Sequence, residues 1–189
     1  MDLGFNEEQE LLRKSARDFL DKECPKKVVR AMEEDPTGHS PDLWNKMADL
    51  GWLGLHLPEK YGGMGFGFLD LCVLLEETGR ALLPGPLFST LVLAGQAIMD
   101  GGTEAQKQNL LPRIAQGKLI MAVAWTEPAG RYDPSGIKLK AQAQGDSYLL
   151  SGTKLFVHDA HIADTLLVAA RTGGTPRSAE GITLFLVDA

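Results

Sequence analysis

The feature that most constrains the fold of this chain is a change of hydrophobic period near Leu119. Before that residue, apolar side chains recur every three or four positions, as on one face of a helix. After it, apolar and polar residues alternate, or run unbroken for the length of one strand. Helices followed by strands indicate the α+β class. We therefore predict an N-terminal all-α helical domain over residues 1–118 and a β domain over residues 119–189, built as an antiparallel barrel or sandwich.

Capping residues mark several helix boundaries. Asn6 precedes an acidic first turn, which favours the start of a helix. Ser40 and Pro41 are suited to the first positions of another helix, and Gly51 is suited to end it. Pro112 lacks the amide hydrogen that a helix interior uses, so we expect it to kink or divide the last helix. Further helices are expected over residues 68–83 and 87–99.

The β domain is expected to contain a hairpin. In residues 137–157, apolar and polar side chains alternate on both sides of Gly145-Asp146, a pair that favours a two-residue turn. Further strands are expected over residues 119–126, 163–171 and 181–188. About five strands would leave exposed sheet edges, which proteins normally cover. We therefore expect the β domain to be truncated, either because the chain is a fragment or because another chain completes it.

Composition excludes some classes of function. The net charge of −6 argues against a nucleic-acid partner, which would need clustered basic residues. The apolar runs are too short to cross a bilayer, and the acidic N-terminus lacks the pattern of a secretion signal. A cytoplasmic protein is the simplest interpretation. The two cysteines make no disulfide framework, and we expect Cys72, in an apolar helical segment, to pack in the core.

Common catalytic motifs are absent from the sequence. It has no Walker loop, no Gly-x-Gly-x-x-Gly after a strand and no nucleophile elbow. His158 and His161 are close in sequence but lack further ligands at a suitable spacing, so we expect no metal site. The glycine-rich residues 58–67 are expected to form a tight connector, because their one lysine precedes the glycines.

Several segments together resemble the acyl-CoA dehydrogenase family. They are "NEEQELLRKSARDFL", "LGWLGLHLPEKYGGMG", "LLEETGRALLPGP", "WTEPAGRYDPSGIKLKA" and "GDSYLLSGTKLFVHDA", in family order and over the whole chain. Family members often carry "TEP-GAGSD-…-GIKT-A" and then "Y-ING-K-WITN". The equivalent positions run from Thr126 to Asp133, from Gly136 to Lys138 and from Tyr148 to Asp159.

The resemblance implies an FAD-dependent enzyme of lipid or sterol catabolism. Family members oxidise the Cα–Cβ bond of an acyl-CoA thioester to an enoyl-CoA and pass the electrons to an electron-transferring flavoprotein. A carboxylate base from a C-terminal four-helix bundle removes the α proton. The resemblance therefore places no catalytic residue in this chain and implies that the chain alone is inactive. The complete protein would be a homo- or hetero-oligomer.

The resemblance also implies which residues contact the flavin. Donors at the end of the apolar run would face the pyrimidine side of the ring and stabilise charge on the reduced flavin. Phe156 stands where the family has a tryptophan beside the ring, and His158 stands where a threonine bonds flavin N5. The cofactor contacts implied in this way are Val123, Ala124, Trp125, Thr126, Arg131, Tyr132, Phe156, Val157 and His158, and Tyr132 would also face the substrate.

The loop after the apolar run departs from the family pattern. Arg131 and Tyr132 replace a glycine and a serine. Arg131 would either pair with a phosphate of FAD or block a close approach of the backbone, and both readings stay open. We expect Glu127 to fix the turn before Pro128 rather than to act as the base, because the family's base lies in the bundle.

Three functions stay open at this point. The first is a dehydrogenase whose C-terminal domain is not in this sequence. The second is a non-catalytic or half-site subunit of a hetero-oligomer, a pattern found in bacterial relatives that degrade sterol side chains. The third is a related flavin-dependent monooxygenase. The sequence does not indicate the length of the acyl chain.

Overall fold

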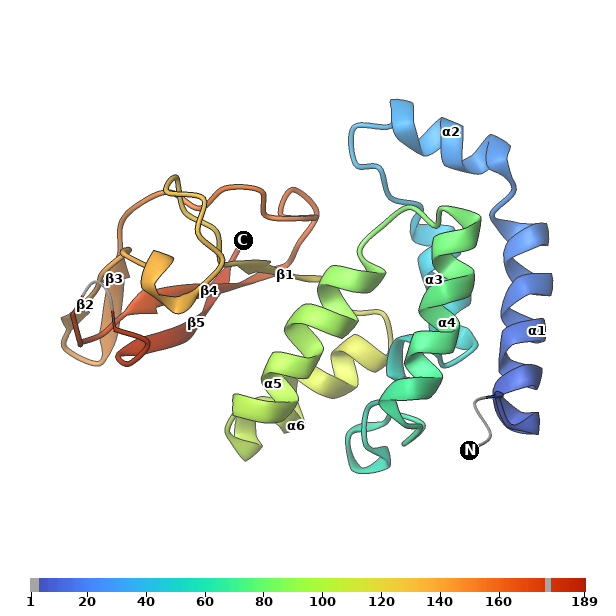
Figure 1. Cartoon of the computed structure of the whole chain (residues 1–189), viewed down its shortest axis with the longest axis horizontal. Helices are drawn as coiled ribbons and strands as arrows, with labels where there is room; N and C mark the ends of the chain where they lie inside the picture. Colours follow the sequence, from blue (N-terminus) through green and yellow to red (C-terminus); the bar gives the residue numbers. More distant parts are fainter. Residues whose placement is uncertain (1–3, 176–177) are drawn as a thin grey trace. The chain divides into compact units, whose positions relative to one another are not determined.

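The computed structural model describes residues 4–175 and 178–189, and the chain divides into two compact units (Figure 1). One unit comprises residues up to 87 with residues 98–118, and the other comprises residues 88–97 with residues 119–189. The first is helical, and the second holds the strands that the described residues form. The α+β class predicted from the change of period is confirmed.

The helical unit is built on capped helices. Its helices are α1 (Glu7–Glu23), α2 (Lys26–Glu34), α3 (Pro41–Asp49), α4 (Phe68–Ala81) and α6 (Glu104–Ala115), with the 3-10 turns η1 (Trp52–Gly54) and η2 (Glu59–Tyr61), while α5 (Gln96–Gly101) spans the boundary between the units. Asn6 and Gln9 accept hydrogen bonds from each other's amides, which satisfies two donors at the start of α1. Ala16 and Leu20, four residues apart on one face of α1, are fully buried.

Helix α3 begins and ends where the sequence predicts. The Ser40 side chain accepts from the Leu43 amide, Pro41 takes the first helical position, and Gly51 has the left-handed φ of 77°. The predicted tight connector follows. In it, Gly63 packs so closely that an added Cβ would lie 2.0 Å from the Leu57 carbonyl oxygen, so a glycine is required.

Helices α1 and α4 meet around a buried carboxylate. Glu77, 1% exposed, accepts from Arg17 at 2.6 and 3.0 Å and from Arg80 at 2.8 Å. The hydrogen bond from Arg17 holds the pKa of Glu77 below its ordinary value despite burial. Near the start of α4, Asp70 accepts from the Gln9 side chain at 2.9 Å. These contacts fix the register of the two helices.

Three details of the helical unit differ from the sequence prediction. Helix α2 was not expected, because Lys26 and Lys27 replace an acidic first turn and Pro25 gives no side-chain cap. Pro112 does not divide α6, which continues through it at the cost of one internal hydrogen bond. The prediction for Cys72 is wrong: its side chain is exposed, because the buried stripe of α4 falls on other positions.

The second unit holds two small sheets. Its elements are the π-helix η3 (Phe88–Gly95), β1 (Met121–Ala124), the 3-10 turn η4 (Pro134–Gly136), β2 (Ala141–Gln144), β3 (Ser147–Leu150), β4 (Thr165–Arg171) and β5 (Ile182–Asp188). One sheet has the order β1-β4-β5, and β2 pairs with β3. Gly145 and Asp146 form the predicted two-residue turn. Among the described strands, the two sheets are not closed into a barrel.

Strand β1 runs parallel to β4, which differs from the all-antiparallel arrangement predicted. Met121 lies opposite Thr165 in this pair, whereas β4 and β5 are antiparallel as expected. Residues 125–164 carry the hairpin and several turns between the two strands, and a connection of that length returns the chain to the same end of the sheet. Residues 151–157, predicted to continue a strand, are loop instead.

Candidate functional site

The edge of β1 that faces away from β4 is held by η3. Thr90, fully buried, donates to the Met121 carbonyl and accepts from the Met121 amide, both at 3.1 Å. Because successive residues of a strand direct their backbone groups to opposite edges, the Val123 amide points to the same edge as that of Met121. Among the described residues, no hydrogen bond occupies the Val123 amide there.

Thr126 is the second residue after β1 and is 8% exposed. Its carbonyl accepts from the Leu155 amide at 2.8 Å. Within the described part of the chain no hydrogen bond engages its hydroxyl, whose oxygen is not among the fully buried unpaired atoms and is therefore accessible. Trp125 is half-buried, and its carbonyl accepts from the Lys154 ammonium at 3.2 Å. Ala124 is buried. The sequence-predicted residues 123–126 thus form one row along the end of β1.

Glu127 is a buried structural carboxylate. It is 7% exposed and accepts from the Lys138 amide at 2.9 and 3.0 Å, from the Leu139 amide at 3.0 Å and from the Lys154 ammonium at 2.9 Å. Burial alone would raise the pKa of Glu127, but the hydrogen bonds from Lys154, Leu139 and Lys138 outweigh it and hold the pKa below its ordinary value. A carboxylate held in this way is unsuited to accept a proton from a substrate.

The turn that follows Lys154 lies beside the end of β1, since the Leu155 amide donates to Thr126. Phe156 has a φ of 52°, and its side chain is 81% exposed. Val157 is half-buried and His158 is exposed. The structure therefore brings the predicted residues 156–158 next to the predicted residues 125–126.

Arg131 and Tyr132 lie on the loop that joins Glu127 to η4. The Arg131 guanidinium donates to Asp133 at 3.0 Å, and the Tyr132 side chain is 77% exposed. Hydrogen bonds from Ser135 and then from Arg131 lower the pKa of Asp133. Gly136 packs against Arg131, where an added Cβ would lie 2.8 Å from the Arg131 carbonyl oxygen. No hydrogen bond within the described residues joins these two side chains to the end of β1.

Sequence reasoning missed Arg171, a buried residue that organises the same loop. Its side chain, 6% exposed, lies at the end of β4. The guanidinium donates to the carbonyls of Ile137, Pro134, Ser178 and Glu180. An arginine closing a buried apolar strand is the sequence signal that would have marked it, because a buried charge needs partners.

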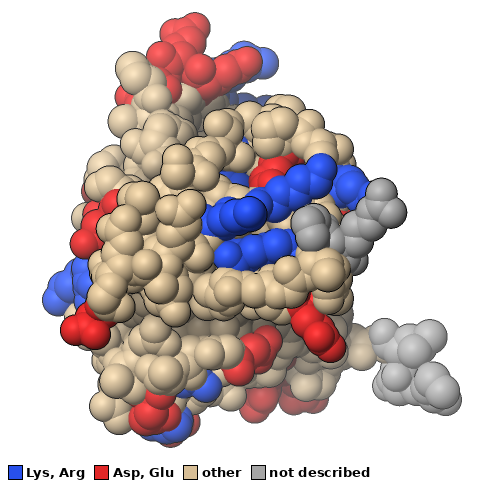
Figure 2. Space-filling view, turned by 90° about the vertical axis from the view of Figure 1, so that its left-hand side faces the viewer, with Lys and Arg blue, Asp and Glu red and all other residues tan. Residues whose placement is uncertain are grey.

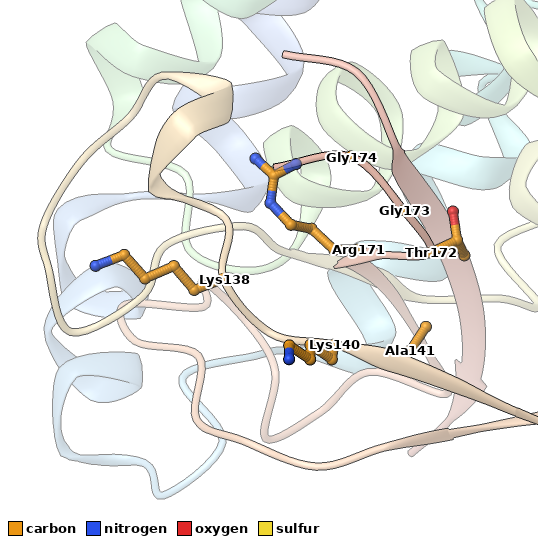
Figure 3. Close-up of a pocket in the computed structure, with 7 residues that line it drawn as sticks. All are labelled: Lys138, Lys140, Ala141, Arg171, Thr172, Gly173 and Gly174. Carbon is orange, nitrogen blue, oxygen red and sulfur yellow. The ribbon is translucent and has the colours of Figure 1, made fainter. Parts of the chain in front are cut away.

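A basic hollow adjoins Arg171. It has a volume of about 440 Å³, and the residues that line it are Lys138, Lys140, Ala141, Arg171, Thr172, Gly173 and Gly174 (Figure 3). Figure 2 shows Lys and Arg side chains gathered on this end of the β-rich unit. Lys138 and Lys140 are both exposed, and with Arg171 bonded to carbonyls their ammonium groups make the hollow positive.

The described residues offer neither a metal-binding cluster nor a membrane-spanning helix. In residues 4–175 and 178–189, no three or more His, Cys, Asp or Glu side chains are grouped so that they could hold a metal ion. Over those same residues, no helix combines the length and the apolar character needed to cross a membrane.

Comparison with known proteins identifies one family over both units of the chain. The family models described as acyl-CoA dehydrogenase, N-terminal domain, and acyl-CoA dehydrogenase, middle domain, match residues 6–118 and 122–189. Mitochondrial isovaleryl-CoA dehydrogenase of Pongo abelii is 34% identical over 98% of this chain and 44% of its own length.

Solved structures are similar over the whole chain. Acyl-CoA dehydrogenase from Geobacillus kaustophilus has a TM-score of 0.84 at 31% identity, covering 100% of this chain and 50% of its own. A chain of the ChsE4-ChsE5 complex from Mycobacterium tuberculosis has a TM-score of 0.81 at 26% identity, covering 100% and 48%. The chain thus spans about half the length of the relatives it matches.

Proposed function

Because this chain belongs to the acyl-CoA dehydrogenase family, whose members are FAD-dependent flavoproteins, we propose that it contributes the flavin-binding face of an acyl-CoA dehydrogenase. When bound, FAD supplies the hydride acceptor for the oxidation of an acyl-CoA thioester to an enoyl-CoA. We further propose an electron-transferring flavoprotein as the electron acceptor and the cytoplasm as the location.

The observation that carries this proposal is the Thr126 hydroxyl. Thr126 is 8% exposed, and no hydrogen bond within the described residues engages its hydroxyl. Its oxygen is not among the fully buried unpaired atoms, so it stays accessible to a ligand. Phe156, 81% exposed, lies on the adjoining turn. An open strand edge, an unused hydroxyl and an outward aromatic ring fit a flat, polar ring system such as the isoalloxazine of FAD.

The residues of the chain have separable roles in this proposal. The Val123 amide and the Thr126 hydroxyl would donate to the ring and stabilise negative charge that develops on it. Phe156 would cover part of the ring and exclude water. Glu127 and Lys154 would hold the end of β1 and the turn at a fixed separation. None of these residues is proposed as the base.

The basic hollow suits the coenzyme A part of an acyl-CoA substrate. Coenzyme A carries several phosphates, and two exposed lysines beside a Gly-Gly turn offer charge and close approach to an anion. We propose that Lys138 and Lys140 favour binding of acyl-CoA through this charge.

The test uses protein expressed from the whole reading frame that contains this chain. We expect it to purify with FAD and to lose the visible absorbance of oxidised flavin when an acyl-CoA is added without oxygen. A panel of straight, branched and steroid acyl-CoA thioesters would define the substrate. Oxygen consumption by the reduced flavin would instead indicate the monooxygenase.

A second candidate is a non-catalytic or half-site subunit of a hetero-oligomer. Arg131 and Tyr132, both exposed on the loop beside the site, depart from the pattern that the resemblance implies. The structural similarity to the ChsE4-ChsE5 complex also favours it. Protein that purifies without flavin, and that gains flavin and activity only with a second chain, would support this candidate over the first.

A further inference from the structure

The turn after Leu155 has an unusual backbone. Phe156 and Asp159 have φ values of 52° and 60°, in the left-handed region that non-glycine residues rarely enter. Aspartate tolerates this region because its short side chain can bond locally, but phenylalanine gains nothing similar. The surroundings must therefore hold the turn in place.

One such contact comes from η3. The Ser89 hydroxyl donates to the Asp159 carboxylate, with 2.5 Å between the two oxygens. Ser89 is 1% exposed, so water competes little for this bond. Short hydrogen bonds from a hydroxyl to a carboxylate are among the stronger ones in proteins. The side chain of Asp159 is thereby anchored outside its own turn.

The neighbouring residue of η3 anchors β1. Thr90 bonds both backbone groups of Met121, and Ser89 bonds Asp159. Two consecutive side chains of one π-helix therefore hold the two walls of the candidate site, the edge of β1 and the turn. Helical segments of this kind are rare and occur frequently at functional sites.

We propose that Ser89 is a positioning residue whose hydrogen bond to Asp159 sets the place of the Phe156–His158 turn relative to the end of β1. This inference rests on the proposed function, because the distance between these two walls decides whether both can contact one flavin ring. Without the bond, the turn relaxes toward ordinary backbone angles, and the Phe156 ring leaves its outward position.

The experiment compares Ser89→Ala and Asp159→Ala with two controls. Asp159→Asn keeps an acceptor and the tolerance for left-handed backbone, so it should behave like the wild type. Ser147→Ala removes an exposed hydroxyl that bonds Gln144 in the hairpin of the same unit. Thermal unfolding confirms that each variant folds. Ser89→Ala removes the donor of the hydrogen bond, and Asp159→Ala removes its acceptor.

The first readout needs no flavin. Amide hydrogen exchange of Ala160 and Ile162, whose amides bond within the turn, should be faster by about tenfold in both alanine variants, as expected for the loss of one buried hydrogen bond. Exchange in β2 and β3 should stay unchanged. Exchange at wild-type rates in Ser89→Ala would overturn the proposal.

The second readout is a titration with FAD into the millimolar range, in which quenching of flavin fluorescence reports binding. The dissociation constant should rise about tenfold in the alanine variants and recover in Asp159→Asn. Faster exchange with unchanged FAD affinity would make the bond purely structural and overturn the positioning role. Faster exchange with no FAD binding by any form, in the chain or in the whole protein, would contradict the proposed function itself.

Discussion

Thr126 shows how a single residue is assigned a role by the partner it lacks. Its carbonyl accepts from the Leu155 amide, while no hydrogen bond within the described residues engages its accessible hydroxyl. For the proposed dehydrogenase, Thr126→Val keeps the shape and removes the donor. We expect flavin reduction by acyl-CoA to slow about a hundredfold, or roughly 3 kcal/mol, in single-turnover measurements.

Thr165→Val is the matched control for this change. Thr165 is equally buried, at 8% exposed, and begins the neighbouring strand β4. It should reduce its flavin at the wild-type rate. If Thr126→Val does so as well, the hydroxyl has no part in the chemistry.

Glu127 and Lys154 form the second residue-scale prediction. Both side chains are less than a tenth exposed, so Glu127→Gln leaves the Lys154 charge buried without its partner. We expect a loss of about 3 kcal/mol in the free energy of unfolding, measured in urea. The double variant with Lys154→Met should recover much of this loss. Glu10→Gln, which breaks an exposed pair with Arg13, should cost less than about 1 kcal/mol.

A further prediction concerns pH. His56 is 8% exposed, and neither ring nitrogen has a partner within the described residues, so burial lowers its pKa. The unfolded chain binds a proton to this histidine below about pH 6.5, whereas the folded chain resists it. Stability is therefore complete above about pH 6.5 and falls by up to about 1.4 kcal/mol for each pH unit below it.

Urea unfolding between about pH 7 and about pH 5 tests this prediction. His56→Leu should flatten the decline, while substitution of the exposed His158 by leucine should leave it in place. An equal decline in wild type and His56→Leu would assign the effect to other groups. The protonation of His56 then would not govern acid stability.

At the scale of single residues, the sequence predicted local roles better than distant ones. The site residues of β1 and of the turn rest on the family resemblance, and the structure places them side by side. Glu127 was expected to be structural, and its contacts agree. Ser89 was missed because its partner Asp159 lies 70 residues away, and two of the four carbonyls that Arg171 bonds lie 34 and 37 residues away, separations that periodicity cannot reveal.

At the scale of elements, the hydrophobic pattern predicted where most helices and strands occur, but it did not predict the relative direction of paired strands. The alternation of residues 137–157 correctly marked a hairpin, since its turn lies within the pattern. A buried strand such as β4 has the same apolar pattern whether its neighbour is parallel or antiparallel, so the parallel pairing of β1 was not foreseen. Helix α2 lacks a side-chain cap and fully buried residues, so its ends were unmarked, although Val28, Val29 and Met32 have helical spacing.

The element-scale prediction concerns the contact between η3 and β1. Thr90→Val leaves the amide and carbonyl of the fully buried Met121 without partners. Each unsatisfied group costs about 1–3 kcal/mol, so we expect a loss of at least about 2 kcal/mol in urea unfolding. Thr90→Ser keeps the hydroxyl and should lose clearly less. Equal losses in the two variants would mean that packing, not hydrogen bonding, joins η3 to β1.

At the scale of the whole molecule, the chain matches about half the length of its relatives. The candidate site consists of one strand edge, one turn and one loop, all from the second unit. Such a surface contacts a flavin from one side only. The buried area, and with it the binding free energy, is correspondingly limited.

This leads to the last prediction, that the 189-residue chain on its own binds FAD too weakly to retain it. A flat ring held on one face keeps its other face in water, so the donors at Val123 and Thr126 compete with solvent and gain little. Arg131 is paired with Asp133 through Nε, so the neighbouring carboxylate weakens the attraction of its remaining donors for a phosphate. The absorbance of the purified chain should show no flavin, and equilibrium dialysis should give a dissociation constant well above the micromolar range. Stoichiometric FAD retained through purification would mean that the edge of β1, the turn and the loop form a complete site by themselves.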